Sequence, residues 1–201
     1  MIEVPDAFAP RVVGFEPLAS GFDVRNARGA LAGRVVTPGG RFAITVDFPT
    51  MTSERALKLK ALLIAAKGQG LRMAMPLGGE KQAGGAGVVN GSGAAGQSLP
   101  VRGLVPGCMI RQGYWLTVVD ADGNHCLHSV AQPVRVADDG TATITVEFPL
   151  RTVLVDGDDV VLSRPVIEGL VTTDVNWSIP VGRRVEGLGF RLEEVEAGEV
   201  A

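Results

Sequence analysis

The stretch from Gly40 to Gly68, GRFAITVDFPTMTSERALKLKALLIAAKG, constrains the fold of this 201-residue chain more than any other. It begins with the alternation of apolar and polar side chains that is typical of a half-buried β-strand. The strand is predicted to end at Pro49, because proline has no N–H group to donate to a neighbouring strand. The apolar members of the alternation are Phe42, Ile44, Val46 and Phe48.

A helix is predicted over about residues 52–67, directly after this strand. Glu54 lies in its first turn, where the helix dipole favours a negative charge, and Gly68 is expected to end it. The rest of the chain reads as short aliphatic strands and turns, in keeping with 27 glycines and 5% aromatic residues. The predicted fold class is therefore mainly β with one α-helix. The candidate N-caps are Thr50, Thr52 and Ser53.

The predicted helix has two apolar stripes instead of one. Either one stripe packs on the core of its own subunit and the other meets a neighbouring domain or subunit, or the whole helix is buried and its lysine stems extend outwards. On the first interpretation the second stripe is a candidate subunit interface, although the pattern does not say which stripe has which role. The first stripe is Ala56, Leu59, Leu63 and Ala66, and the second is Leu57, Ala61 and Ile64.

A glycine-rich segment divides the chain. Residues 78–96 contain eight glycines and four alanines, a composition typical of linkers or of a loop leading into a new domain. Closely spaced strands follow, and five or six short antiparallel strands suggest a small barrel or sandwich. The strands expected there are 99–101, 115–119, 125–130, 134–137, 141–148 and 160–162.

Two later stretches, 166–179 and 185–195, are also strand-like, but two strands are too few for a domain. The economical arrangement returns them to the N-terminal sheet. Residues 1–77 and 164–201 then form one domain, and residues 78–163 form an inserted one. The charge distribution agrees with this division, because residues 78–163 carry five Lys/Arg and nine Asp/Glu, against fourteen and thirteen in the remainder.

Composition argues against several classes of function. A net charge of −3 provides no basic patch, so specific nucleic-acid recognition has little support. No apolar run approaches the ~20 residues needed to span a bilayer, and the N-terminus lacks the features of a secretory signal. The two cysteines, Cys108 and Cys126, are too few for a disulfide scaffold and are expected to be reduced. We expect a soluble protein made in the cytoplasm.

Candidate sites for chemistry are weak. The turn from Asp120 to Asn124 faintly resembles a calcium loop, but position twelve is Ala131 instead of a glutamate. His125, Cys126 and His128 are the one soft-ligand cluster, and a strand would place only Cys126 and His128 on one face, where a structural zinc needs four ligands. The sequence contains no catalytic signature. It predicts no enzyme, no cofactor and no metal site.

Taken together, the order of segments resembles the distal tail proteins of long-tailed bacteriophages and phage-like particles. The matching pieces begin with the strand–FPTM–helix segment and the strand that ends at Pro76. They continue through VVNGSGAAGQSLPVRGLVPG, YWLTVVDADGNHCLHSV and ADDGTATITVEFPLRTVLVDGDDVVLSRPVIEGL to the strand closing in Glu194. The resemblance covers roughly residues 21–194 and rests on pattern and order.

This resemblance implies a β-sandwich domain with one helix that forms a ring, commonly a hexamer, and carries an inserted barrel similar to an OB-fold or galectin-like module. Such a ring joins the tail tube protein to the baseplate hub protein at the virion tail tip, after assembly in the host cytoplasm. The tape measure protein and later the genome pass through it.

A second hypothesis is a carbohydrate-binding β-barrel used in host adsorption, since small barrels often hold oligosaccharides. Sugar stacking needs exposed aromatic rings, and residues 78–163 offer only Tyr114, Trp115 and Phe148. A third, enzymatic hypothesis rests on the His125, Cys126 and His128 cluster alone.

Overall fold

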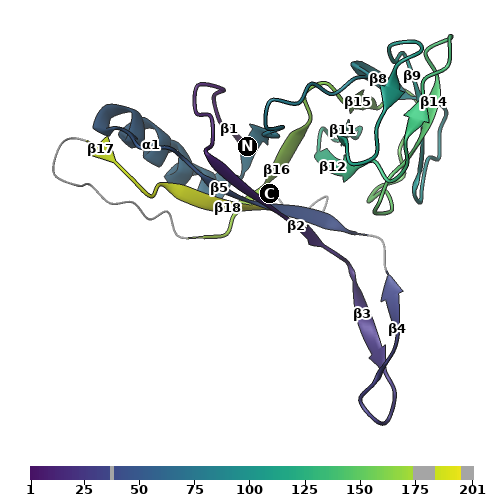
Figure 1. Ribbon diagram of the computed structural model, residues 1–201, viewed down its shortest axis with the longest axis horizontal. Helices are drawn as coiled ribbons and strands as arrows, with labels where there is room; N and C mark the ends of the chain where they lie inside the picture. Colours follow the sequence, from purple (N-terminus) through teal and green to yellow (C-terminus); the bar gives the residue numbers. More distant parts are fainter. Residues whose placement is uncertain (37–38, 174–183, 196–201) are drawn as a thin grey trace.

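The computed structural model describes residues 1–36, 39–173 and 184–195. Within these ranges the protein is mainly β, with several sheets and a single helix, as the sequence predicts (Figure 1). Two six-stranded sheets form the body, and a two-stranded hairpin extends away from it (Figure 1). In the described part of the chain, no helix is long and apolar enough to cross a membrane.

The first sheet combines strands from the two ends of the chain. Its order is β1–β7–β16–β18–β5–β2, and only the β1–β7 pair is parallel. The expectation that the late strands return to the N-terminal sheet is confirmed for β16 and β18, whereas residues 174–179 lie outside the described ranges. The strands are β1 (Ile2–Glu3), β7 (Leu71–Ala74), β16 (Val166–Val171), β18 (Gly189–Glu194), β5 (Arg41–Asp47) and β2 (Val12–Leu18).

One face of this sheet is apolar and the other polar. On β5, Ile44 and Val46 are fully buried while Thr45 and Asp47 are exposed, because successive side chains of a strand point to opposite faces. Their buried cross-strand partners on β18, Leu192 and Phe190, continue the apolar face. The alternation in the sequence therefore marks which side of the sheet carries the core.

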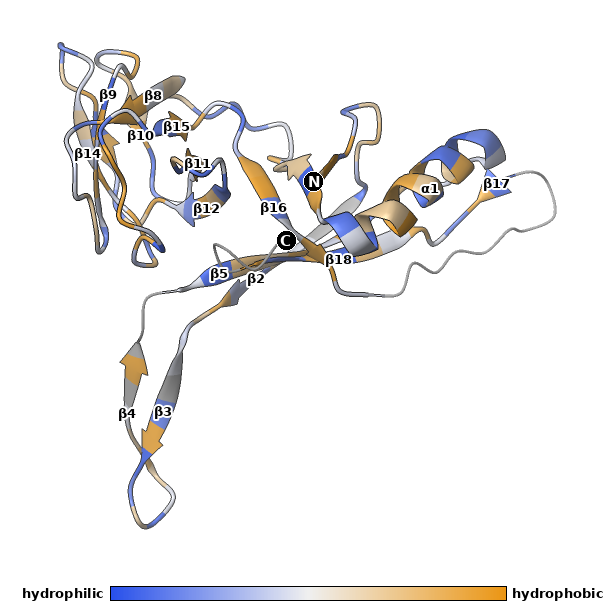
Figure 2. Cartoon of the chain, turned by 180° about the vertical axis from the view of Figure 1, so that it is seen from behind, coloured by the Kyte–Doolittle hydropathy of each residue, from blue (hydrophilic) through white to orange (hydrophobic). Residues whose placement is uncertain are grey.

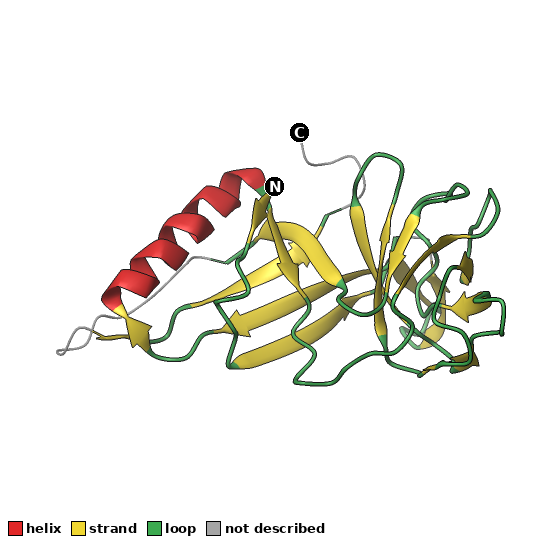
Figure 3. Ribbon diagram, turned by 90° about the horizontal axis from the view of Figure 1, so that it is seen from above, coloured by secondary structure: helices red, strands yellow, loops and turns green. Residues whose placement is uncertain are grey.

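Helix α1 (Ser53–Gln69) packs on the apolar face of the first sheet (Figure 3). The prediction that Gly68 ends the helix is wrong. Gly68 is helical, and the helix ends at Gly70, whose N–H donates to the carbonyl of Ala66 at 2.8 Å. Gly70 has φ +75°, which side chains with a Cβ atom rarely adopt, so this glycine provides the stop. Thr52 is the N-cap residue, without a side-chain capping hydrogen bond.

The second sheet is antiparallel throughout, in the order β12–β11–β15–β8–β9–β14. Its two edge strands approach each other, since Val130 forms a bridge to Val146 and the N–H of Ala131 donates to the carbonyl of Thr145. A separate apolar core lies against this sheet. The strands are β8 (Ala86–Val89), β9 (Ser98–Arg102), β11 (Trp115–Val119), β12 (His125–Ser129), β14 (Ala142–Thr145) and β15 (Asp159–Val161).

Two strands between residues 78 and 163 were not predicted, β8 and the short strand β10 (Met109–Ile110). β8 lies in the glycine-rich segment, where Gly87 has no space for a side chain: a Cβ atom there would lie 2.5 Å from the carbonyl oxygen of Arg102. Its glycine content therefore reflects close strand packing at this point and not only a flexible connection.

Three two-stranded pairings complete the fold of the described residues. The β3–β4 hairpin leaves the first sheet between β2 and β5. The other pairs are β10 with β13 and β6 with β17. Their bounds are β3 (Gly21–Arg25), β4 (Leu31–Val36), β6 (Met51–Thr52), β10 (Met109–Ile110), β13 (Val134–Arg135) and β17 (Arg184–Val185).

Candidate assembly surface

The outer face of α1 is apolar and exposed. Leu59 and Leu63, in the first predicted stripe, are fully buried against the sheet. In the second stripe Leu57 is 62% exposed, Ile64 is 56% exposed, and Ala61 between them is also exposed. The two stripes thus differ in their environment, which excludes a helix buried on all sides. Leu57, Ala61 and Ile64 therefore form an exposed apolar strip along the outer side of the helix.

The β3–β4 hairpin is a second exposed apolar feature. It extends as an arm from the end of β2 and β5, away from both sheets (Figures 1 and 2). Where its side chains are described, between residues 21 and 35, every one is exposed, including Val24, Val35 and Leu31, which is 61% exposed. An isolated two-stranded hairpin is marginally stable in water. The arm is therefore a candidate contact surface.

Hydrogen bonds within the arm shape its turn. The Asn26 side chain accepts from the N–H groups of Arg28 and Ala30, both at 3.0 Å, and Gly29 has φ +79°. The turn is thus locally determined by an Asx-type interaction. Cross-strand pairing joins β3 to β4 along the rest of the arm.

Strand β2 is a third feature, because it forms one edge of the first sheet. Among the described residues, no strand pairs with its outer side. Unpaired edges are ready sites for pairing with another chain, unless proline or charge blocks them. Pro17 removes one donor from β2 and limits how far such pairing could extend.

A buried polar cluster holds the two sheets together. The Glu194 carboxylate accepts hydrogen bonds from the N–H of Phe42 in the first sheet, at 2.8 Å, and of Leu127 in the second, at 2.9 Å. It also pairs with the Arg151 guanidinium at 2.5 Å. Burial raises the pKa of Glu194 and outweighs the opposing effects of Arg151 and the two N–H groups.

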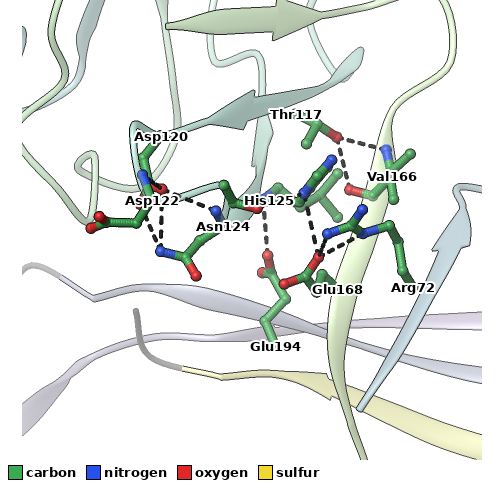
Figure 4. A network of polar contacts seen from close by, with 11 residues as sticks. Arg72, Thr117, Asp120, Asp122, Asn124, His125, Val166, Glu168 and Glu194 are labelled. Atoms are coloured by element: carbon green, nitrogen blue, oxygen red, sulfur yellow. Dashed lines mark hydrogen bonds and ion pairs between the residues drawn. The ribbon is translucent and has the colours of Figure 1, made fainter. Parts of the chain in front are cut away.

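A second ion-pair group lies beside this cluster (Figure 4). Glu168 of β16 pairs with Arg72 of β7 at 2.5 Å and with His125 of β12 at 3.3 Å. Burial is the largest influence on the pKa of Glu168 and raises it, but the hydrogen bonds from His125 and Arg72 together lower the pKa below its usual value. A further hydrogen bond joins the same two sheets: the Thr117 hydroxyl of β11 donates to the carbonyl of Val166 in β16 at 2.8 Å.

Strand β12 separates the three members of the soft-ligand cluster, His125, Cys126 and His128. Cys126 and His128 are buried, whereas His125 faces Glu168 across the junction. Desolvation raises the pKa of Cys126 to about 11 and, with the Arg151 charge, lowers that of His128 to about 3. Such a thiol remains protonated, so it is a poor ligand and a poor nucleophile. The described residues contain no group of three or more His, Cys, Asp or Glu side chains that could hold a metal ion.

The calcium-like stretch is a hairpin turn between β11 and β12. The Asp120 carboxylate accepts from the backbone N–H groups of Asp122 and Asn124, both at 3.0 Å (Figure 4). Its oxygens therefore organise the turn itself.

Both cysteines are free thiols, Cys126 buried and Cys108 partly buried.

Sequence reasoning found the helix strip but missed the arm and the junction. The segment of the arm has the alternation of ordinary strands, and nothing in its composition distinguishes a projecting hairpin from one within a sheet. In the sequence, Glu194 is simply the last residue of the predicted C-terminal strand, next to another glutamate, Glu193. The signal that could have singled it out is its position on the apolar side of the β18 alternation.

Comparison with known proteins adds no relative from which a role could be transferred. No protein-family model matches the chain, and no curated protein matches it.

Proposed function

We propose that this protein is a structural subunit of a phage tail tip, a distal tail protein that assembles into a closed ring. The ring would join the tail tube to the baseplate hub and let the tape measure protein and the genome pass. The observation that carries the proposal is the β3–β4 arm, whose described side chains between residues 21 and 35 are all exposed.

The placement of the exposed surfaces favours a ring. The arm leaves one end of β2 and β5, whereas α1 lies towards the other end of the same strands (Figure 1). A contact that joins the arm of one copy to a different surface of the next is heterologous. Heterologous contacts produce closed rings when the rotation between copies closes, and open filaments when it does not.

The domain organisation belongs to the same proposal. The first sheet with α1 would be the ring domain, in the place of the expected β-sandwich, and residues 78–163 would be an inserted small barrel similar to an OB-fold or galectin-like module. What supports the inserted barrel is its own apolar core and the bridge between Val130 and Val146 at the sheet edges.

The polar face of the first sheet suits the wall of a conduit. On β2, β5 and β18 five charged side chains lie on this face, and their formal sum is −1. DNA phosphates bind where lysine and arginine are in excess, so a wall without a basic excess would let the genome pass without holding it. The five side chains are Glu16, Arg41, Asp47, Arg191 and Glu193.

Ring formation can be tested by measuring the mass and shape of the full-length protein, alone and with tail tube and hub proteins. Light scattering after size exclusion and negative-stain microscopy should show closed rings. Replacing residues 22–35 by a short glycine turn, or introducing Ile64→Asp, should leave a folded monomer that forms no ring.

The matched control is Ala65→Asp, which adds the same charge to an exposed position on the Lys58 face of the helix. This variant should assemble like the wild type. A wild-type protein that stays monomeric at high concentration, with both partners present, would refute the proposal.

A further inference from the structure

A cleft of about 840 Å³ opens where the N-terminal segment, the connection after β7 and the loop before β11 meet. This volume lies in the range of ligand-binding pockets, ~300–1,000 Å³. Its walls come from both halves of the molecule. Phe15 belongs to β2 and Arg11 directly precedes it, whereas Arg111, Tyr114 and Trp115 come from the loop before β11 and the start of that strand. Neither half would form the cleft alone.

Three aromatic rings line one wall of the cleft. Phe15, which is 45% exposed, stacks on Trp115 with ring centroids 5.5 Å apart and planes at 27°. Trp115 is held from behind by Phe42, edge to face at 4.9 Å. Tyr114 is half-buried beside them. Phe15 thus presents an aromatic surface that is already ordered.

The backbone under this wall is fixed by a buried glutamine. Gln82 accepts from the N–H of Trp115 at 2.7 Å and donates to the carbonyls of Trp115 and Leu162, at 2.8 and 2.6 Å. All three bonds tie the connection after β7 to the strands of the second sheet. A ligand would therefore meet a preorganised site and would not have to order it.

The charges in the cleft favour an anion. The charged residues that line the cleft are Arg11, Arg111 and Glu80, and their charges sum to +1 in a chain of net charge −3. Among the described residues, neither guanidinium has an ion-pair or hydrogen-bond partner. Their planar forks suit carboxylate and phosphate groups, which they can bind through two parallel hydrogen bonds.

We propose that this cleft binds an acidic saccharide, one that carries carboxylate or phosphate groups. The apolar face of a sugar ring would stack on Phe15 and Tyr114, while Arg11 and Arg111 would bind the anionic groups. Single-stranded nucleic acid also offers bases that stack on aromatic side chains and phosphates that bind arginine, but it requires a continuous basic groove. Glu80 in the cleft and the acidic chain argue against that ligand. The proposal goes beyond ring formation and does not depend on it.

The experiment begins with an array of acidic and neutral bacterial saccharides probed with the full-length protein. Isothermal titration then compares trigalacturonate with neutral galactotriose. We expect signal on acidic saccharides only, and binding of trigalacturonate that weakens as salt is raised. Arg111→Ala and Arg11→Ala should each weaken the binding of any acidic ligand found by about tenfold, the usual effect of losing a charge-assisted hydrogen bond.

Phe15→Ala should weaken binding by a similar factor without changing the melting temperature greatly, because the ring is half exposed. The matched control is Arg28→Ala at the tip of the arm, which should bind like the wild type. Three results would each overturn the proposal: no signal on any acidic saccharide, equal binding of acidic and neutral sugars, or preferential binding of a single-stranded oligonucleotide.

Discussion

The buried carboxylate of Glu194 is paired with the guanidinium of Arg151, and this pair joins the first sheet to the segment that follows the second sheet's β14. The side chains are 0% and 4% exposed, respectively. A buried carboxylate is stable only when its charge is matched and its oxygens are satisfied. Here two backbone N–H groups and one guanidinium fulfil that requirement.

Arg151→Met should destabilise the protein by ~3–5 kcal/mol, because it leaves Glu194 buried without its counter-charge. The pKa of Glu194, already raised, would rise further. When the pKa of a carboxyl group is higher in the folded than in the unfolded chain, the folded chain binds more protons. The free energy of unfolding then decreases as pH rises above the unfolded-state pKa. The variant should therefore lose more stability at pH 8 than at pH 5, as measured by urea unfolding. Adding Glu194→Gln to Arg151→Met should recover part of the loss, and equal losses at both pH values would contradict this account.

The two faces of α1 should respond differently to a charge. Leu59→Asp or Leu63→Asp places a carboxylate in the core, at a cost of several kcal/mol out of a total stability of ~5–15 kcal/mol, and should prevent folding. Leu57→Asp and Ile64→Asp alter exposed positions and should melt like the wild type. Circular dichroism of all four variants provides the comparison. Similar melting across both pairs would show that the helix has no distinct core face.

Acid should destabilise the protein through His128. Its pKa is about 3 in the folded chain against 6.5 ordinarily. Because the native value is depressed, only the unfolded chain takes up a proton as pH falls below ~6.5, and folding stability decreases by up to ~1.4 kcal/mol per pH unit. A His128→Leu variant should show a shallower decrease between pH 6.5 and 4.5 in urea unfolding. The control, His125→Leu, should retain the steep one.

Removal of residues 78–163 should leave a folded but weakened first domain. The N–H of Met75 donates to the carbonyl of Pro165 at 2.8 Å, so a short glycine linker can join Leu77 to Arg164. The truncated protein loses Leu127 and Trp115, which pack on the first core. Glu194 loses the N–H of Leu127 and the guanidinium of Arg151 and keeps only the N–H of Phe42 as a partner. We therefore expect cooperative melting at a lower temperature, improved by adding Glu194→Gln. Loss of all cooperative unfolding in both forms would show that the two cores fold only together.

Two glycines should respond in opposite directions to alanine. Gly68 is helical with no atom within 4 Å of an added Cβ, so Gly68→Ala should stabilise the protein by ~0.5–1 kcal/mol. At Gly169 the added Cβ would lie 2.0 Å from the carbonyl oxygen of Glu193, and Gly169→Ala should destabilise by at least ~1–3 kcal/mol. Thermal melting of the two variants compares the same chemical change in two environments.

The sequence by itself determined the elements whose signals are local. The alternation around Ile44 predicted β5 and its buried face, and helical spacing predicted the stripe with Leu59 and Leu63, although not that this stripe is the buried one. It also indicated the second stripe, with Leu57 and Ile64, because a helix exposes every residue at a defined angle. These patterns depend only on the geometry of one element, so a single stretch of sequence is sufficient to read them.

Only the tertiary structure decided which distant residues meet. The stacking of Phe15 on Trp115 and the pairing of Glu194 with Arg151 join positions far apart in the chain, and no periodicity records such contacts. The residue at which α1 ends was also decided by the tertiary structure. Gly68 and Gly70 are both glycines near the end of the predicted helix, but only Gly70 has the positive φ. The projection of the arm follows from where β2 and β5 end in the sheet. Each of these outcomes is set by long-range packing, whose free energy is absent from any local pattern.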